Sequence, residues 1–451
     1  MRDSREDAKT RSRKWPPLAS AIRKAAWRLL PFLLLLYILA FLDRANVGFA
    51  KQRLLADTGL SEAAYAFGAG VFFIGYALLE VPSNLMMHRV GARIWICRIM
   101  VTWGMVSAAM MFAWSEDVFY ALRFLLGVAE AGFFPGIILY LMYWFPAASR
   151  GRMLGLFYFG APLAFVFGGP LSGWLMGLDG FAGLRGWQWM FLVEGAAASV
   201  AGVAVFWYLP NRPADAAWLS DPERLSLQGA LDREADWKAK HGPHGVLAAL
   251  RHPRVLHYAV LYLLIQMSVY GVTFFLPARV EQLLGRQAGF VVGCVTAIPW
   301  LCALVAAWAV PALAARSGRP RTVAALALIC AAIGIATSSS GPPMLAMAAL
   351  CLAAAAFIGV QPVFWTFPTD ELAGAAAAGS IALINSFGAI GGFVAPNVRT
   401  WADQTFASPA AGPLVLAMAT LLGALLVSLI PRIRTPDPQR MPDAIPDAQS
   451  R

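Results

Sequence analysis

Charged residues are scarce in this chain. Of its 451 residues only 14% are charged, whereas 59% are hydrophobic, and the mean hydropathy is +0.62. A soluble protein of this length needs far more charge to cover its surface. The stretches between the apolar runs are also too short to fold around a core of their own. These two shortages exclude a soluble multidomain protein and indicate a protein embedded in a membrane.

Cysteine and histidine are scarce too. The cysteines lie in apolar segments without the spacing of metal ligands, so we expect small buried side chains and no metal site. The histidines lie in loops or at predicted helix ends. An intramembrane enzyme needs a nucleophile–base pair or metal ligands at membrane depth, and the sequence offers neither. We therefore expect no enzyme and no cofactor, and a proton relay within the membrane must use carboxyl groups. The residues concerned are Cys97, Cys294, Cys302, Cys330 and Cys351, with His88, His241, His244, His252 and His257.

Long apolar runs fill most of the chain. About 20 apolar residues cross the roughly 30 Å of bilayer hydrocarbon as one helix, and the sequence contains twelve such runs. We predict an all-α membrane protein with twelve transmembrane helices in two pseudo-symmetric six-helix bundles. The predicted helices are 27–49, 63–87, 93–114, 117–143, 152–178, 188–209, 255–276, 289–315, 321–338, 343–367, 376–400 and 411–430.

Polar segments flank and separate the bundles. The segment between them is rich in Pro, Asp, Glu, Lys and Arg, and its residues 216–240 could form a short amphipathic helix. The last segment is rich in Pro and Asp, so we expect it to be disordered. The predicted division is a basic cytoplasmic tail at 1–26, a first bundle at 27–209, a cytoplasmic linker at 210–254, a second bundle at 255–430 and a disordered tail at 431–451.

The net charge of +11 could indicate a nucleic-acid partner, but its distribution along the chain does not. With the N-terminus inside, 28 of the 36 Lys and Arg residues fall in the tails and inner loops, and six fall in outer loops. Cytoplasmic loops retain positive charge. We therefore predict a multi-pass protein of the bacterial inner membrane with both termini in the cytoplasm. Its partners are the lipid bilayer and a small solute rather than nucleic acid, and a monomer suffices.

The two predicted bundles share sequence landmarks. Arg89 follows the second predicted helix and Arg316 follows the eighth, 227 residues later. Phe-Pro pairs follow the fourth and tenth helices and place Pro146 and Pro368 222 residues apart. Two independent landmarks at nearly one offset indicate a duplicated six-helix unit. Transporters built from such repeats hold their substrate near the membrane midplane, between the halves.

Several motifs support a family resemblance. They are Leu42–Ala50 in the first helix, Gly75–Leu85 running toward Gly91–Arg93, Arg123–Glu130 in the fourth, Phe145-Pro146, and Ile384–Gly388 with Gly391–Phe393 in the eleventh. In this order the set resembles the major facilitator superfamily and, within it, the anion:cation symporter family. The resemblance covers nearly all of residues 27–430. It implies a carrier of organic anions such as sugar acids, hydroxy acids or aromatic carboxylates, usually moved with protons. The chain departs from the superfamily pattern at His88, which replaces the usual acidic residue and puts the carboxylate latch of that turn in doubt.

Two charged residues lie within the fourth predicted helix. A charge in the hydrocarbon costs about 2.5–3.5 kcal/mol on insertion scales, so it pairs or lines a cavity. Arg123 and Glu130 are seven residues apart, which places them on nearly one face, roughly 10 Å along the helix. We expect both to point at a central cavity, and the resemblance implies a substrate arginine and a proton-linked acid at these positions. A buried pair that only fixes helix packing is the alternative.

Two further charges adjoin in the first predicted helix. Asp43 and Arg44 are about 100° apart around it. One is therefore expected to face the cavity and the other a neighbouring helix, unless both lie at the outer edge of the cavity. Tyr37 is seven residues before Arg44 and shares its face, where a phenol could hydrogen-bond a carboxylate. The alternatives are an interfacial pair that snorkels to water and an ordinary buried tyrosine.

Uncharged residues complete the predicted substrate site. Tyr76, Gln361, Asn385 and Ser386 are the candidates, partly from the resemblance. Tyr158 and Trp365 are further candidates, and Tyr262, Gln266 and Tyr270 repeat every four residues, a pattern that more often reflects packing. Two other acidic residues are interpreted as structural. Glu80 is expected to pair with basic groups at the cytoplasmic turn, and Glu194 to brace the outer part of the sixth helix.

These residues suggest a transport cycle driven by protons, which are the expected coupling ions. Arg44 and Arg123 would bind the substrate carboxylate through charge-assisted hydrogen bonds. Ionised Asp43 and Glu130 would compete for the arginines until protonation releases them. The expected activity is proton-coupled uptake of a small organic carboxylate by alternating access. A proton-driven exporter or anion exchanger is the alternative that the run Gly160–Gly173 favours, although close helix packing explains that run better. An intramembrane enzyme is a remote alternative function.

Overall fold

The computed structural model describes residues 17–241, 246–285, 290–339, 342–372 and 374–431. Within these residues the secondary structure is helical, and twelve helices are long and apolar enough to cross a membrane. The prediction of an all-α fold with twelve membrane-spanning helices is therefore confirmed. The predicted disordered tail and most of the predicted N-terminal tail lie outside the described residues.

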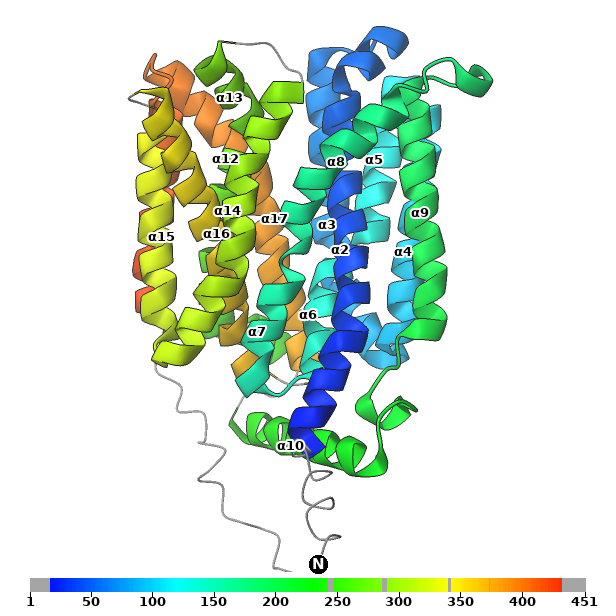
Figure 1. Ribbon diagram of the computed structural model, residues 1–451, viewed down its shortest axis with the longest axis vertical. Helices are drawn as coiled ribbons and strands as arrows, with labels where there is room; N and C mark the ends of the chain where they lie inside the picture. Colours follow the sequence, from blue (N-terminus) through cyan, green and yellow to red (C-terminus); the bar gives the residue numbers. More distant parts are fainter. Residues whose placement is uncertain (1–16, 242–245, 286–289, 340–341, 373, 432–451) are drawn as a thin grey trace, which may run out of the picture.

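Two groups of helices stand side by side (Figure 1), one from blue to green and the other from light green to red. The N-terminal half comprises α2 (Pro17–Thr58), α3 (Glu62–Val90), α4 (Ala92–Ala109), α5 (Glu116–Glu130), α6 (Phe133–Trp144), α7 (Ala147–Phe157), α8 (Gly160–Met176) and α9 (Gly186–Tyr208). The linker contains α10 (Asp221–His241) and α11 (Val246–Leu250). The C-terminal half comprises α12 (Pro253–Thr273), α13 (Leu276–Leu284), α14 (Phe290–Ser317), α15 (Pro320–Thr337), α16 (Pro343–Glu371), α17 (Gly374–Thr405) and α18 (Ala411–Ser428).

The two halves pack their helices in the same pattern. In the N-terminal half the first span packs on the fifth, the second on the fourth and the third on the sixth, through α2·α8, α3·α5 and α4·α9. The C-terminal half repeats these pairs through α12·α17, α14·α16 and α15·α18. The halves meet through α3·α17 and α8·α14. This arrangement confirms the duplicated six-helix unit that the sequence landmarks predicted.

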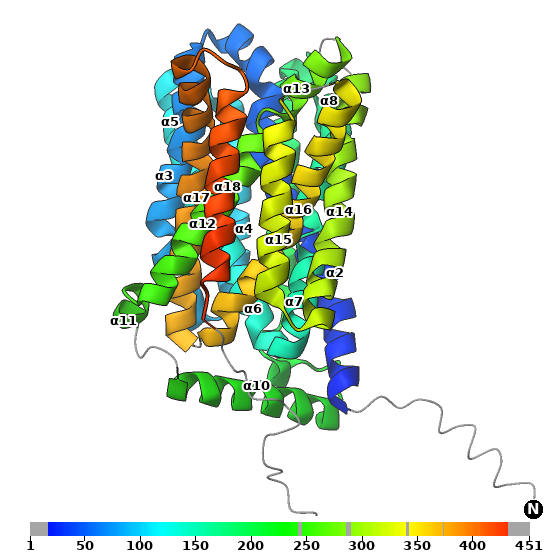
Figure 2. The ribbon, with the colours of Figure 1, turned by 90° about the vertical axis from the view of Figure 1, so that its left-hand side faces the viewer.

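The linker helix α10 lies across one end of the bundle (Figures 1 and 2), which we call the linker end. The first span begins there at Pro17, ten residues earlier than predicted, so it includes residues assigned to the tail. These extra turns contact α10: Ser20 Oγ and Lys24 Nζ donate to Glu223 at 2.6 and 2.8 Å. Burial opposes the charge on Glu223, but these bonds and those from Ser220 lower its pKa to about 2. The ionised carboxylate therefore fastens the linker to the first span.

The fourth span is not the single helix that the sequence predicted. It breaks between α5 and α6, where Ala131 leaves the helical conformation with a ψ of 128° and Gly132 has a φ of +87°. Only glycine adopts this left-handed conformation without a steric cost, and a Cβ on Gly132 would lie 2.3 Å from Ser83 Oγ. Ser83 Oγ satisfies the freed carbonyl of Ala131 at 2.7 Å. The break makes Glu130 the last residue of α5.

The predicted fifth span is also divided, into α7 and α8, with Tyr158 and Phe159 between them. Tyr158 and Phe159 form a turn and both keep a helical backbone, so the span continues across the junction. Tyr158 is buried at this junction and lines the central pocket described below.

Helices α3 and α5 pack without any side chain between them at one point. A Cβ on Gly127 would lie 2.1 Å from Phe72 O and 2.9 Å from Tyr76 N. Backbone atoms cannot move aside as a flexible side chain can, so the crossing requires glycine. This close approach brings Tyr76 of α3 next to the end of α5 that carries Glu130.

We expect Gly127→Ala to push α3 and α5 apart and to lower the melting temperature of the purified protein by several degrees or to prevent its folding. Gly173→Ala is the matched control. Nothing lies within 4 Å of a Cβ at that position, and alanine favours a helix over glycine by about 1 kcal/mol. Equal melting temperatures for the two variants would contradict the requirement for glycine at the crossing.

Candidate central binding pocket

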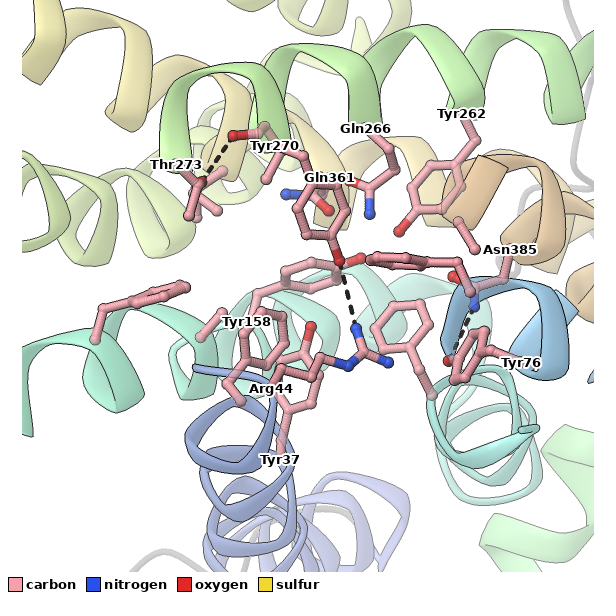
Figure 3. Close-up of a pocket in the computed structure, with 18 of the residues that line it drawn as sticks. Tyr37, Arg44, Tyr76, Tyr158, Tyr262, Gln266, Tyr270, Thr273, Gln361 and Asn385 are labelled. Carbon is pink, nitrogen blue, oxygen red and sulfur yellow. Dashed lines mark hydrogen bonds between the residues drawn. The ribbon is translucent and has the colours of Figure 1, made fainter. Parts of the chain in front are cut away.

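A pocket lies between the two halves, near the middle of the bundle (Figure 3). Helix α2 contributes Tyr37 and Arg44 on one side, and α12 contributes Tyr262, Gln266 and Tyr270 on the other. Of the described residues that line it, only Arg44 is charged. The remaining lining residues are Phe41, Phe73, Tyr76, Phe134, Tyr158, Ala161, Phe165, Val269, Thr273, Trp300, Ile358, Gln361, Asn385 and Ala389.

The pocket is small because its aromatic walls are close together. Its free volume is about 40 Å³. A solute of several carbon atoms therefore requires aromatic side chains to move apart. Phe165 of α8 stacks on Trp300 of α14 with ring centroids 4.5 Å apart. This contact joins the two halves beside the pocket.

Arg44 occupies the centre of the pocket wall. Its Nε and Nη2 donate to Glu130 Oε1 at 2.9 and 2.6 Å, and its Nη1 donates to Tyr270 Oη at 3.4 Å. Its guanidinium carbon also lies 5.1 Å from the ring centroid of Tyr76. The Arg44 side chain is 21% exposed, whereas that of Glu130 is fully buried. A buried carboxylate thus holds a guanidinium that reaches both halves and the pocket.

Only one oxygen of Glu130 is used in this pair. Oε1 accepts both bonds from Arg44, while the buried Oε2 has no hydrogen-bond partner among the described residues. A buried polar atom without a partner is costly. Protonation of Glu130, or displacement of Arg44, would directly change how well this carboxyl group is stabilised. Glu130 does not line the pocket itself, so it acts on the pocket through Arg44.

Asp43 points away from the pocket. Its carboxylate accepts hydrogen bonds from Ser107 Oγ and, at 2.8 Å, from Trp103 Nε1, both on α4. Arg44 faces the pocket and Asp43 faces a neighbouring helix, which is the first of the two arrangements expected from their 100° separation. Tyr37 shares the face of Arg44, as their spacing predicted.

Arg123 does not line the pocket in this structure. Its side chain is buried, Nε donates to Gly68 O at 3.2 Å, and its guanidinium carbon lies 4.9 Å from the ring centroid of Phe72. Both contacts are with α3. The structure therefore brings Arg44 and Glu130 together but does not form the two-arginine clamp that the sequence suggested.

The interpretation of Glu80 as a partner of basic groups at the turn is wrong. Glu80 is fully buried and accepts from the side chains of Asn385 and Ser386 of α17, with Ser386 Oγ at 2.7 Å from Oε2. Asn385 also donates to Tyr76 Oη at 3.3 Å. Asn385 and Tyr76 line the pocket, whereas Ser386 lies behind it with Glu80. The sequence could not reveal this contact because it joins two helices about 300 residues apart in the chain.

The other predicted residues fall where expected or close by. Gln361 lines the pocket on α16. The four-residue spacing of Tyr262, Gln266 and Tyr270 favours packing, but in the structure all three line the pocket. Glu194 of α9 accepts from Ser172 of α8 at 3.2 Å and so braces two helices of the N-terminal half. Trp300 and Phe165 were missed, because bulky aromatic residues in apolar helices give no signal that separates lining from packing.

Polar contacts close the bundle between the pocket and the linker end. Arg150 of α7 pairs with Glu234 of α10, and its Nη1 lies 2.9 Å from Asp370 Oδ1 of α16 and donates to Thr369 O at 3.2 Å. Asn84 Nδ2 of α3 donates to Ala378 O of α17 at 2.6 Å. With the Glu80 contacts, these bonds join both halves and the linker. A solute could leave through this end only after they break.

Two six-helix halves around a central pocket, joined by polar contacts, form the architecture of a membrane transporter. The chain belongs to the Major Facilitator Superfamily, whose family model matches residues 33–396. It is 49% identical over 410 residues to the inner membrane transport protein RhmT of Escherichia coli, covering 91% of this chain and 95% of that protein. It is 42% identical over 414 residues to a putative tartrate transporter of Agrobacterium vitis, covering 91% and 94%. The protein is therefore a multi-pass membrane transporter and not an enzyme.

A solved structure supports the fold independently. The proton:xylose symporter XylE bound to 6-bromo-6-deoxy-D-glucose matches with a TM-score of 0.73 over 92% of this chain and 97% of that chain. At 16% sequence identity this likeness concerns the fold alone.

We expect Arg150→Ala to open the linker end more often, because it removes the cation shared by Glu234 and Asp370. The measurement is the rate at which a maleimide labels an Ala378→Cys variant in a background without the native cysteines. Labelling should become several-fold faster with Arg150→Ala. Arg152→Ala, two residues further along α7, is the control and should leave the rate unchanged. An unaltered rate with Arg150→Ala would show that these ion pairs do not hold the end closed.

Proposed function

We propose that the protein takes up a small organic carboxylate together with protons, across the bacterial inner membrane. The observation that carries the proposal is the Arg44–Glu130 pair at the pocket. Arg44 offers a planar donor group that suits a carboxylate, and Glu130 is the internal carboxylate that accepts its hydrogen bonds in this structure. A substrate carboxylate and Glu130 therefore compete for the same guanidinium.

Protonation of Glu130 would decide this competition. Neutral Glu130 attracts Arg44 less strongly, so the guanidinium becomes available to a carboxylate in the pocket. Tyr270, Asn385 and Gln361 are the neutral hydrogen-bonding groups that we propose for the remainder of the substrate. Loss of the proton on the other side of the membrane would restore the internal pair and expel the anion. Tyr37 and Tyr76 would contact the substrate through their phenol rings.

The orientation of the cycle follows from charge. Lys and Arg are concentrated in the tails and in the loops on the same side as the N-terminus, and cytoplasmic loops retain positive charge. We therefore propose that the linker end faces the cytoplasm and that the structure is closed on that side. In this state the pocket would load from the periplasm.

The substrate class is proposed from the pocket and from the relatives. One relative is named as a putative tartrate transporter, and a guanidinium surrounded by phenols and amides suits a hydroxylated acid. A thermal-shift screen with tartrate, gluconate and benzoate covers the hydroxy-acid, sugar-acid and aromatic classes, since a solute that binds only the folded state raises its melting temperature. Substrate-driven counterflow in vesicles of known orientation distinguishes uptake from export.

We expect Arg44→Ala to weaken binding of the acid selected by this screen about 10- to 100-fold. A hydrogen bond to a charged group contributes about 1.5–3 kcal/mol, and each 1.4 kcal/mol is tenfold in affinity. Titration calorimetry measures the loss. Arg44→Lys keeps the charge without the planar donor group, so its affinity should lie between those of wild type and Arg44→Ala. Unchanged affinity in Arg44→Ala would remove Arg44 from the site.

Arg123 and Asp43 have separate roles to test. Direct binding by Arg123 requires its guanidinium to leave Gly68 and Phe72 during the cycle. Unchanged affinity in Arg123→Ala would show that it does not contact the substrate. Asp43, the other candidate proton site, would have to loosen its hydrogen bonds to α4 in order to take a proton, so we assign the coupling proton of this region to Glu130.

We expect Glu130→Gln to uncouple transport from the proton that Glu130 binds. The amide keeps the shape of the protonated acid but carries no exchangeable charge, so counterflow should continue while accumulation against a gradient falls below the wild-type level. Vesicle uptake driven by an imposed pH gradient measures both. Glu116→Gln is the control, because Glu116 is exposed in the first turn of the same helix. Accumulation by Glu130→Gln at the wild-type level would exclude Glu130 as the coupling group.

A further inference from the structure

Glu80 is a buried carboxyl group with only neutral partners. It lies on α3 with no exposed surface, and the side chains of Asn385 and Ser386 reach it from α17. Among the described residues, no lysine, arginine or histidine forms an ion pair with it. A buried charge is expensive unless it is paired, and within a membrane bundle such a group marks a functional site by default. The geometry is that of a proton-binding carboxyl rather than a permanent ion pair.

The hydrogen bonds around Glu80 can accommodate a proton without moving a heavy atom. Ser386 Oγ lies 2.7 Å from Glu80 Oε2 and 3.0 Å from Ala382 O in its own helix. When Glu80 is ionised, the hydroxyl donates to Oε2. When Oε2 carries a proton, the hydroxyl can turn to Ala382 O and accept from Glu80. Asn385 donates to Oε1 in both states.

Among the described residues, the titratable groups that act on Glu80 include Arg44 of α2, Tyr76 of α3 and Tyr262 of α12, while α17 presents the neutral pair Asn385 and Ser386. Arg44 is already engaged by Glu130. Tyr76 and Asn385 separate Glu80 from the pocket, and both touch the pocket and the Glu80 cluster. A proton from the pocket therefore has a short polar route to Glu80.

Glu80 also lies at the contact that must open. Its partners belong to the other half of the molecule, so the bonds that stabilise it break when α3 and α17 separate at the linker end. Water that enters there would solvate the ionised carboxylate and favour release of the proton. Closure removes this water and favours the protonated form again. The movement of the halves thus changes the environment of Glu80 on every cycle.

We propose that Glu80 binds a second transported proton, in addition to the one at Glu130, and releases it on the linker side when the two halves part. The proposal rests on the proposed proton-coupled uptake and specifies its stoichiometry. With one proton at each site, two protons accompany each substrate. Uptake of a monoanion would then carry one net positive charge inward, and uptake of a dianion would be electroneutral.

The test is the number of protons moved per substrate in vesicles that contain the purified protein, with gluconate or tartrate as the probe that the thermal-shift screen selects. The substrate gradient at which net flux stops, under an imposed pH gradient and a clamped membrane potential, gives the proton-to-substrate ratio. Wild type should show two protons per substrate. Glu80→Gln keeps the hydrogen-bonding shape but has no exchangeable proton, so the ratio should fall by one while uptake driven by the pH gradient persists.

Glu194→Gln is the matched control, because Glu194 is also a buried carboxyl bonded to a serine but has its partner in the same half. It should leave the ratio unchanged. A proton-to-substrate ratio that stays at the wild-type value in Glu80→Gln overturns the proposal. A ratio of one in wild type overturns it too, and that measurement does not depend on whether a variant folds. If wild type moved no protons at all, proton-coupled uptake itself would be wrong, and this outcome is distinct from the other two.

Discussion

The pair between Arg44 and Glu130 is the interaction on which the rest of the site depends. A guanidinium within a membrane bundle is stable only while an anion or a polar cavity compensates it, and here one buried oxygen of Glu130 takes that place. The backbone break at Gly132 puts Glu130 at a helix end, and the close approach at Gly127 brings Tyr76 alongside. Two glycines thus position the acid and the ring that face Arg44.

Much of the fold could be predicted from sequence because a bilayer leaves few choices. Backbone groups in hydrocarbon must be satisfied within each segment, so apolar length alone identified the spans, and two landmarks revealed the repeat. Helix rotation was predictable where spacing fixes it, as for Tyr37 and Arg44. The prediction of helix rotation was wrong where the direction of a side chain depends on contacts with a neighbouring helix. Arg123 faces α3 and Glu80 faces α17, and no local pattern distinguishes these directions from the cavity. The break at Gly132 was also missed, because glycine in a membrane helix equally serves packing.

The two halves are joined by contacts of different kinds. Toward the linker end they share directional polar bonds, such as Arg150 with Asp370 and Asn84 with the carbonyl of Ala378. Beside the pocket they meet through aromatic rings, with Phe165 stacked on Trp300 and Phe73 edge-on to Tyr270 at 6.1 Å between centroids. Hydrogen bonds weaken steeply as their atoms move apart, whereas aromatic rings stay in contact when they slide past each other. The bundle is therefore built to break at the linker end and to adjust around the pocket.

The buried acids differ in what a rigid movement of the halves would do to them. Asp43 and Glu194 have their hydrogen-bond partners within the N-terminal half, so rocking leaves those partners in place. A change in their protonation would have to come through a neighbouring charge. Glu130 is also within one half, but its partner Arg44 reaches the pocket and responds to an anion there. Glu80 alone among these four is bonded across the division. Substrate binding thus acts first on Glu130 and conformational change acts first on Glu80, which gives the two events separate carboxyl groups through which a proton gradient can drive them.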